Sequence, residues 1–305
     1  MSDKSKKLHF ISFADGTSPI ISAGARLLKQ SKDTRIFASS EVFNKKDLMV
    51  LNQIDESISA LMNLENHGFG FFIWKPLLIK TVLESNLKEG DVLVYTDSGT
   101  EIVNNIIAKN RFLRMIKKLD DQPVLAFRTN YPEENWTKRI CLDLLNKEND
   151  KHTPQIEATT ILLRKCDVSM SFVRAWCNIA TLDNGKFIDL TLTDESKNFI
   201  EHREDQSIFS VLYKNEGFES LKLAMPAFYD NPKRISFLQR WAYGTLLLWP
   251  IRNRTGYSLV GKRQNSLTLS ALGYPLIYVV KPIYKFRRFI KGVKWYIRSK
   301  VWKKA

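Results

Sequence analysis

The stretch that decides the fold is Gly90-Asp91-Val92-Leu93-Val94-Tyr95-Thr96-Asp97-Ser98-Gly99. Its middle is an apolar run of strand length that ends in an aspartate and then a glycine. A buried parallel strand has this pattern, and open α/β sheets bind their ligands at the carboxyl ends of such strands. Asp97 is the first polar side chain after the run. We therefore expect it at the centre of an active site, although Asp-Ser-Gly is also common turn chemistry.

Strand and helix patterns alternate on both sides of this stretch. Further strands are predicted at 8–14, 34–39, 123–127, 157–164 and 221–223, and helices at 17–31, 47–63, 73–83, 99–119, 133–146, 168–180 and 200–214. Such alternation is typical of an α/β protein whose mostly parallel sheet is flanked by helices. We expect this body to occupy residues 1–230 and to carry the catalytic site.

The charge is distributed unevenly along the chain. All 32 acidic residues lie in 1–230 with 30 of the 47 basic ones, whereas residues 231–305 hold 17 basic residues and no acid. A basic segment attached to a nearly neutral body indicates an anionic partner, either a membrane surface or a nucleic acid.

Residues 231–305 are predicted to form a separate, basic helical extension. Between Ile283 and Val301, apolar residues recur at steps of three and four, and lysines and arginines fill the other faces. This is the pattern of a helix that lies in a membrane surface. The simpler alternative is a helix docked on the body with its basic face in solvent. A nucleic-acid-binding arm needs no apolar stripe rich in aromatic residues, so we expect no nucleic acid partner.

The cysteines and the apolar segments bear on the compartment. Cys141, Cys166 and Cys177 follow no metal-ligand spacing, and their odd number argues against a disulfide framework. A reduced, cytosolic compartment fits this usage. The polar N-terminus lacks the apolar core of a signal peptide, and no apolar run approaches the length of a spanning helix. We expect a cytoplasmic protein held peripherally at the inner face of the plasma (inner) membrane.

Three other segments carry residues that suit a site around Asp97. In 70–76, Lys75 stands at a helix start, where it is well placed for phosphate oxygens. In 136–138, Trp-Thr-Lys supplies an aromatic face, a hydroxyl and a cation, which suits a sugar ring or a nucleotide. The segment 202–207, His-Arg-Glu-Asp-Gln-Ser, is dense in polar groups ahead of an apolar helix.

Each of these segments also has a simpler interpretation. Trp74 could only pack and Lys75 could be solvated. Trp136-Thr137-Lys138 resembles many amphipathic helix starts. Asp205 could be only the N-cap of a helix that begins at Gln206. If both are helical, His202 and Asp205 share a face instead.

Taken in order, the segments 69–76, 91–99, 136–138 and 202–207 resemble a group of bacterial glycosyltransferases that assemble capsule and lipopolysaccharide O-antigen chains. The likeness extends over residues 8–225 and lies in the ordered set of motifs. It implies a GT-A fold, a nucleotide-sugar donor, with a UDP-sugar favoured, and Mn²⁺ or Mg²⁺. The usual metal motif of that fold is Asp-X-Asp. Here Gly99 stands in place of the second acid, which leaves Asp97 as metal ligand, with His202 as its possible helper.

The resemblance also suggests a role for each residue. Asp205 is the first choice of general base and Glu204 the second. The donor-binding residues are then Trp74, Lys75, Asp97, Ser98, Gly99, Trp136, Lys138 and Gln206. The activity implied is that of a hexosyltransferase that acts on a lipid-linked or polysaccharide glycan acceptor at an anionic membrane surface.

Two alternatives of other classes remain. One is a nucleic-acid-binding α/β module with a basic C-terminal arm, and the other is a different nucleotide-dependent transferase. The sequence has no Gly-rich phosphate loop of either common type, which disfavours kinases and dinucleotide-binding enzymes.

Overall fold

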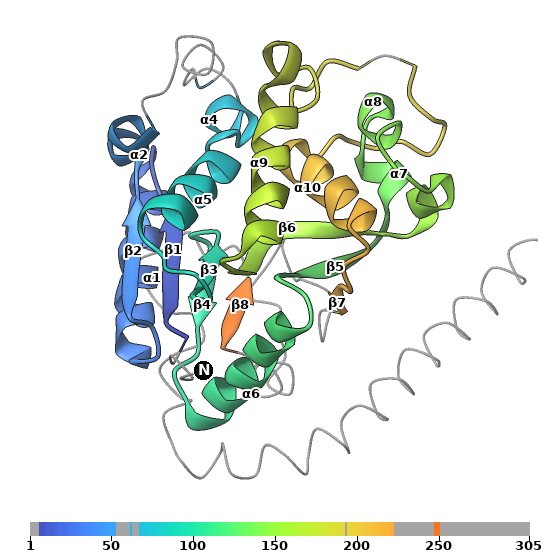
Figure 1. The fold of residues 1–305 in the computed structure, drawn as a ribbon. Helices are drawn as coiled ribbons and strands as arrows, with labels where there is room; N and C mark the ends of the chain where they lie inside the picture. The colour runs from blue at the N-terminus through green and yellow to red at the C-terminus, as the bar shows by residue number, and fades with distance from the viewer. Residues whose placement is uncertain (1–5, 53–61, 63–66, 193, 223–246, 251–305) are drawn as a thin grey trace, which may run out of the picture.

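The computed structural model describes residues 6–52, 62, 67–192, 194–222 and 247–250 (Figure 1). Its centre is a six-stranded sheet in the order β2-β1-β3-β6-β5-β7. The strands are β1 (Leu8–Phe13), β2 (Ser39–Phe43), β3 (Val92–Thr96), β5 (Val124–Pro132), β6 (Pro154–Arg164) and β7 (Leu221–Lys222). Strand β1 runs parallel to β2 and β3, and β5 runs parallel to β7, whereas β6 is antiparallel to both its neighbours. The predicted α/β fold with a mostly parallel sheet is confirmed.

Helices cover both faces of this sheet. The α-helices are α1 (Ser18–Thr34), α2 (Lys45–Asn52), α4 (Gly68–Phe71), α5 (Trp74–Ser85), α6 (Ile106–Ile116), α7 (Glu133–Trp136), α8 (Arg139–Leu142), α9 (Asp167–Thr181) and α10 (Glu204–Asn215). Short 3₁₀ turns are η1 (Lys117–Asp120), η2 (Glu148–His152) and η3 (Leu182–Gly185). Helices α5, α9 and α10 pack on one face, and α1 and α6 pack on the other.

Strand β3 is buried on both faces, because its side chains point alternately into the cores on the two sides of the sheet. Leu93 and Tyr95 enter the core beneath α5 and α9, whereas Val92 and Val94 enter the core beneath α1 and α6. Successive side chains of a strand point to opposite faces, so a central strand with helices on both sides needs an unbroken apolar run. The run Val92–Thr96 meets this requirement.

Three predicted elements are wrong in their bounds. Residues 34–39 are not a strand: Thr34 ends α1, Arg35 takes a left-handed conformation at φ 59°, and β2 begins only at Ser39. The predicted helix 99–119 is divided, because Thr100–Ile102 forms strand β4, and α6 starts after Asn105, whose side chain accepts a hydrogen bond from the Ala108 N–H. The predicted helix 133–146 is two short helices, α7 and α8.

Strand β4 owes its conformation to a partner far along the chain. It pairs antiparallel with β8 (Leu248–Pro250). Part of the chain beyond residue 230 is therefore packed with the body. The boundary at 230 and the predicted helix 283–301 lie outside the described residues. In the ranges that the structure describes, no helix is both long and apolar enough to cross a membrane.

Candidate active site

The sheet has a switch point between β1 and β3. The chain passes from β1 to β2 on one side and later returns to pair β3 with the other side of β1. The carboxyl ends of strands that flank such a point form the crevice where open α/β sheets bind ligands. Ile11 of β1 lies opposite Tyr95 of β3, so Asp97 follows at the level of Phe13. Asp97 then begins a tight turn, since its carbonyl accepts a hydrogen bond of 2.9 Å from the Thr100 N–H.

At this point three of the predicted motifs meet around one lysine. Lys75 Nζ, from the start of α5, lies 2.8 Å from Asp205 Oδ2 and 3.4 Å from Asp97 Oδ1. The side chains of Lys75 and Asp205 are 5% and 6% exposed, whereas that of Asp97 is 42% exposed. The cluster is thus a buried ion pair attached to one carboxylate that faces solvent.

Tyr95 fixes the direction of that exposed carboxylate. Its hydroxyl donates a hydrogen bond of 2.7 Å to Asp97 Oδ1. Burial raises the pKa of Tyr95 well above its ordinary value, and the charge of Asp97 adds to the effect. The phenol therefore stays protonated and acts only as a donor to Asp97 at neutral pH.

Burial and the neighbouring charges decide which side chains of the cluster are protonated. Burial raises the pKa of Asp205 to about 7, although the charge of Lys75 acts in the opposite direction. For Lys75, burial lowers the pKa, but Asp205 and Asp97 together outweigh it, and the net shift is upward. Lys75 is thus a permanent cation, and Asp205 is the member that gains or loses a proton near neutrality.

Glu204 has a different partner from its neighbour. Its Oε1 lies 2.9 Å from Nδ1 of His67, which is largely exposed. Burial raises the pKa of Glu204, and His67 partly offsets this. Glu204 also adopts a φ of 38°, an uncommon value for a side-chain-bearing residue. This backbone turn lets adjacent carboxylates reach separate partners, His67 and Lys75.

An unusual left-handed turn leads into the helix of Lys75. Gly68 to Phe72 all have positive φ, between 55° and 78°. The Phe72 N–H donates to the Gly68 carbonyl at 3.3 Å, and Trp74 Nε1 donates to the same carbonyl at 3.0 Å. Such a conformation costs about 1–2 kcal/mol for each residue that has a side chain, so the surrounding contacts must enforce it. It determines where α5 begins and therefore where Lys75 lies.

Arg26 holds the Asp97 turn from beneath. This buried residue of α1 donates to the Ser98 carbonyl at 3.1 Å and to the Thr100 carbonyl at 3.0 Å. On the other side of the turn, the Thr100 hydroxyl is 2.6 Å from the Thr96 hydroxyl. Sequence reasoning missed Arg26, because nothing in the pattern of α1 distinguishes it from a solvated basic residue.

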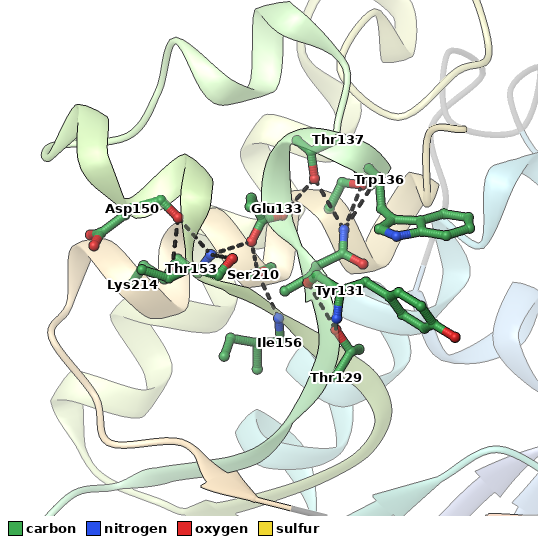
Figure 2. A network of polar contacts seen from close by, with 12 residues as sticks. Thr129, Tyr131, Glu133, Trp136, Thr137, Asp150, Thr153, Ile156, Ser210 and Lys214 are labelled. Atoms are coloured by element: carbon green, nitrogen blue, oxygen red, sulfur yellow. Dashed lines mark hydrogen bonds and ion pairs between the residues drawn. The ribbon is translucent and has the colours of Figure 1, made fainter. Parts of the chain in front are cut away.

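The motif 136–138 belongs to a buried network (Figure 2). Glu133, which is fully buried, accepts from the Thr137 hydroxyl at 2.5 Å and from the Ser210 hydroxyl, and it pairs with Lys214 Nζ at 2.6 Å. Lys214 Nζ also donates to the Asp150 carbonyl at 3.1 Å. These bonds join α7 to α10, and α10 begins with Glu204 and Asp205.

Two predicted site residues are engaged away from the cluster. Lys138 is buried, and its Nζ lies 2.6 Å from Asp189 Oδ1. His202 accepts from the Lys138 N–H at 3.3 Å through Nδ1 and pairs with the Phe187 carbonyl at 3.0 Å through Nε2. Burial lowers the pKa of His202 to about 3, so the ring is neutral. With both nitrogens bonded to backbone, His202 is placed to brace α8.

The remaining predicted residues lie around the cluster. Trp74 is buried and stacks on Phe13, with ring centroids 4.0 Å apart, which agrees with the packing interpretation. Trp136 is half-buried beneath the guanidinium of Arg203, 4.4 Å from the ring centroid. Gln206 donates to Gln155 at 2.7 Å and accepts from the Ala158 N–H. Ser98 and Gly99 are half-buried in the Asp97 turn.

A cavity of about 720 Å³ lies at the carboxyl ends of β1 and β2. Its walls are Ala14, Asp15, Ile21, Gly24, Ala25, Leu28, Val42, Asn44, Lys45 and Lys46. Gly24 allows α1 to approach β1 closely, since a Cβ there would stand 2.4 Å from the Cβ of Ala14. The walls are mostly apolar, and the polar residues among them are Asp15, Asn44, Lys45 and Lys46. Sequence reasoning did not find this cavity, because its walls come from segments without a distinctive motif.

The side chains around Lys75 offer few ligands for a metal ion. Among the described residues, no group of three or more His, Cys, Asp or Glu side chains gathers in a way that could hold a metal ion. Mg²⁺, however, is often bound by one or two carboxylates together with substrate phosphates and water. Asp97, with its half-exposed carboxylate, fits a cation of this kind, held jointly by the protein and a bound diphosphate.

Comparison with known proteins gives similar solved structures but no family. No protein-family model matches the chain, and no curated protein matches it. Similar solved structures include a glycosyltransferase involved in the glycosylation of the major capsid of PBCV-1, at 9% identity over 64% of this chain and 81% of that chain, with a TM-score of 0.35. Mouse xyloside xylosyltransferase 1 is 12% identical over 72% of this chain and 84% of its own, with a TM-score of 0.38.

A third structure is 4-diphosphocytidyl-2C-methyl-D-erythritol synthase from Anaerococcus prevotii, which is 12% identical over 68% of this chain and 98% of its own, with a TM-score of 0.32. At these scores the three likenesses carry no argument about activity.

Proposed function

We propose that this protein is a glycosyltransferase that moves a sugar, a hexose in our view, from a nucleotide-sugar donor to a glycan acceptor. One observation carries the proposal. Lys75, Asp97 and Asp205 come from three separate motifs, and at the switch point of the sheet the Lys75 ammonium lies 3.4 Å from the Asp97 carboxylate and 2.8 Å from that of Asp205. An α/β sheet binds its ligand at this place. The three motifs are also among those that resemble bacterial glycosyltransferases in sequence.

The donor is proposed to lie along the edge from the cavity to Asp97. The cavity is of the size that small-molecule sites usually have, and its apolar walls suit the base and ribose of a nucleotide, with a uridine favoured. The diphosphate then lies by the Asp97 turn, with Ser98 and Gly99 beneath it. Mn²⁺ or Mg²⁺, held by Asp97 and the diphosphate, would offset the negative charge that develops on the leaving group.

Asp205 is proposed to accept the proton of the attacking hydroxyl. A general base works best when its pKa lies near the working pH, and burial raises the pKa of Asp205 to about 7. Lys75 holds the carboxylate at 2.8 Å and so keeps it in one orientation. Glu204, which pairs with His67, is the second choice.

Lys75 is proposed to act on the site through Asp97 and not through direct phosphate contact. It is buried between two carboxylates, and its charge is already shared by them. The cluster therefore carries no excess positive charge toward a diphosphate. This balance makes a donor that arrives with a divalent cation more suitable than a bare diphosphate.

The acceptor is proposed to be a lipid-linked or polysaccharide chain of a surface glycan, of the O-antigen or capsule kind, at the inner face of the membrane. The support is the charge distribution, because residues 231–305 are strongly basic and contain no acid. A basic amphipathic segment is attracted to an anionic lipid surface by about 1 kcal/mol for each cation near it.

A donor screen tests the proposal. Purified full-length protein is heated with UDP-, GDP- and CMP-sugars, each with and without Mn²⁺, and the midpoint of unfolding is recorded. We expect one class of donor to raise it, with a larger rise when Mn²⁺ is present. Asp97→Asn should abolish the Mn²⁺-dependent part, whereas Asp143→Asn, in an exposed ion pair with Arg139, should not. The absence of a shift with every donor would refute the proposal.

A further inference from the structure

Helix α6 and the following turn form a basic surface that the proposed chemistry does not use. From Ile102 to Leu119 the chain contains five basic residues and no acidic one. The five are Lys109, Arg111, Arg114, Lys117 and Lys118. In Figure 1 this helix lies at the lower edge of the molecule, apart from α5, α9 and α10. It packs on the sheet through Ala108, Phe112 and Ile116.

The outer face of α6 is apolar as well as basic. Ile106 is 57% exposed and Leu113 is 40% exposed. At about 100° per residue these two positions lie almost in line along the helix, and Lys117 continues the line. Lys109 and Arg114 flank it on either side. Two large aliphatic side chains bordered by cations are what an interfacial helix presents to a bilayer.

Strand β8, far beyond α6 in the sequence, begins close to the start of α6. Strand β8 pairs with β4, and the Val103 N–H donates to the Leu247 carbonyl at 2.8 Å, three residues before α6 begins. Residues 251–305, which follow β8, contain 14 Lys and Arg and no Asp or Glu. Because β8 runs antiparallel to β4, with Leu248 opposite Ile102 and Pro250 opposite Thr100, its beginning lies beside α6, and the basic segment that follows it leaves the described body at the Thr100 end, next to the Asp97 turn. The same positive sign on both argues against the segment itself covering the helix, and it favours one common anionic partner.

We propose that the outer face of α6 is a second contact with the membrane, one that docks on an anionic lipid surface through Ile106, Leu113, Lys109 and Lys117. The inference rests on the proposed membrane location but not on the proposed reaction. With α6 at one end of the β4–β8 pair and the start of the basic segment at the other, the folded body is held at the bilayer at two points. Its orientation relative to the surface is then fixed. A nucleic acid would match the charge but has no use for exposed aliphatic side chains.

Vesicle binding of the full-length protein tests this contact. The vesicles are phosphatidylcholine, with or without phosphatidylglycerol at about one third of the lipid. We expect Lys109→Gln with Lys117→Gln to lower the partition coefficient on anionic vesicles about fivefold for each cation removed. Ile106→Ser with Leu113→Ser should lower it by a similar factor. The basic C-terminal segment is present in every variant, so a difference reports on α6 alone.

Matched variants elsewhere serve as controls. Val168→Ser with Leu182→Ser removes two exposed aliphatic side chains near α9, on the opposite face of the sheet, and Arg139→Gln with Arg174→Gln removes two exposed cations. Both should bind vesicles like the wild type.

Two results would overturn the inference. In one, the α6 variants bind like the wild type. In the other, the charge variant loses duplex DNA and vesicle binding equally while the aliphatic variant loses neither. Loss of vesicle binding with no sugar transfer by the wild type would refute the proposed reaction and leave the α6 contact standing.

Discussion

Two buried lysines in this protein make a useful comparison. Lys214 pairs with Glu133, whose two oxygens also accept from Thr137 and Ser210, so every polar atom around the pair is bonded inside the protein. Lys75 is shared by two carboxylates, and one of these, on Asp97, faces solvent. We call Glu133 and Lys214 with their bonded neighbours the closed set, and such a neutral set serves to hold helices together. We call Lys75, Asp97 and Asp205 the open set. With one more acid than base and one exposed member, it is suited to bind something further.

The closed set is where the largest loss of stability is expected. Glu133→Ala leaves Lys214 buried without its carboxylate, and breaking such a pair on one side costs about 3–5 kcal/mol. Chemical denaturation measures this as a drop in the free energy of unfolding. Glu133→Leu with Lys214→Met, which removes both charges, should recover most of it. If Glu133→Ala unfolds like the wild type, the network does not support the fold.

The open set should respond in the opposite way, in activity and not in stability. Asp97→Asn keeps the shape of a half-exposed side chain, so the free energy of unfolding should change by less than about 1 kcal/mol. Turnover should fall by roughly 10²–10³, which is typical when one group that stabilises a developing charge is lost. Asp143→Asn, also exposed and ion-paired, is the control for both readouts. A variant that keeps its turnover would remove Asp97 from the site.

The residues of the open set could be predicted because each stands at a strand end or a helix start. An apolar run followed by Asp97 predicts a strand edge, and a lysine ahead of an apolar helix predicts Lys75. In the closed set, Glu133 and Lys214 are 81 positions apart in the chain, and each looks like an ordinary surface charge. The reversed strand β6 and the pairing of β4 with β8 were missed for the same reason, since a partner distant in sequence leaves no local pattern.

Other predicted residues make contacts of their own, away from Lys75 and Asp97. Lys138 and His202 stand out as polar groups in motifs, and the structure uses them to bond Asp189 and the Phe187 carbonyl. A motif reports that residues are needed together. It does not say whether they contact a ligand or one another, because both uses place polar side chains at helix starts.

The turn ahead of Lys75 offers a way to disturb the open set from a distance. Gly68 has a φ of 59°, and a Cβ there would lie 2.5 Å from the ring of Phe72. Gly68→Ala should cost about 1 kcal/mol for its backbone and a further 1–3 kcal/mol for the clash. Gly90→Ala is the matched control, since Gly90 has a φ of 85° but open space around its Cβ position. Thermal unfolding of both variants gives the difference, and equal losses would mean that Phe72 yields without strain.

A last prediction concerns pH. The pKa of Asp205 is about 7 in the folded protein, against 3.8 for an ordinary aspartate. Between these values the folded state holds a proton that the unfolded chain has lost. The contribution of Asp205 to stability is therefore full below about pH 4 and is lost as the pH rises toward 7, by up to about 1.4 kcal/mol per pH unit. His202, whose pKa is lowered to about 3, acts with the opposite sign over much of this range.

Comparison with Asp205→Asn isolates the aspartate, because His202 titrates in both proteins. The free energy of unfolding of the wild type minus that of the variant should decline from pH 4 to pH 7 and then level off. If Asp205 is the base, turnover of the wild type should rise over the same range, by about tenfold per pH unit below 7. A stability difference that stays constant with pH would show that Asp205 remains ionised beside Lys75. The open set would then hold its carboxylates as firmly as the closed set holds Glu133.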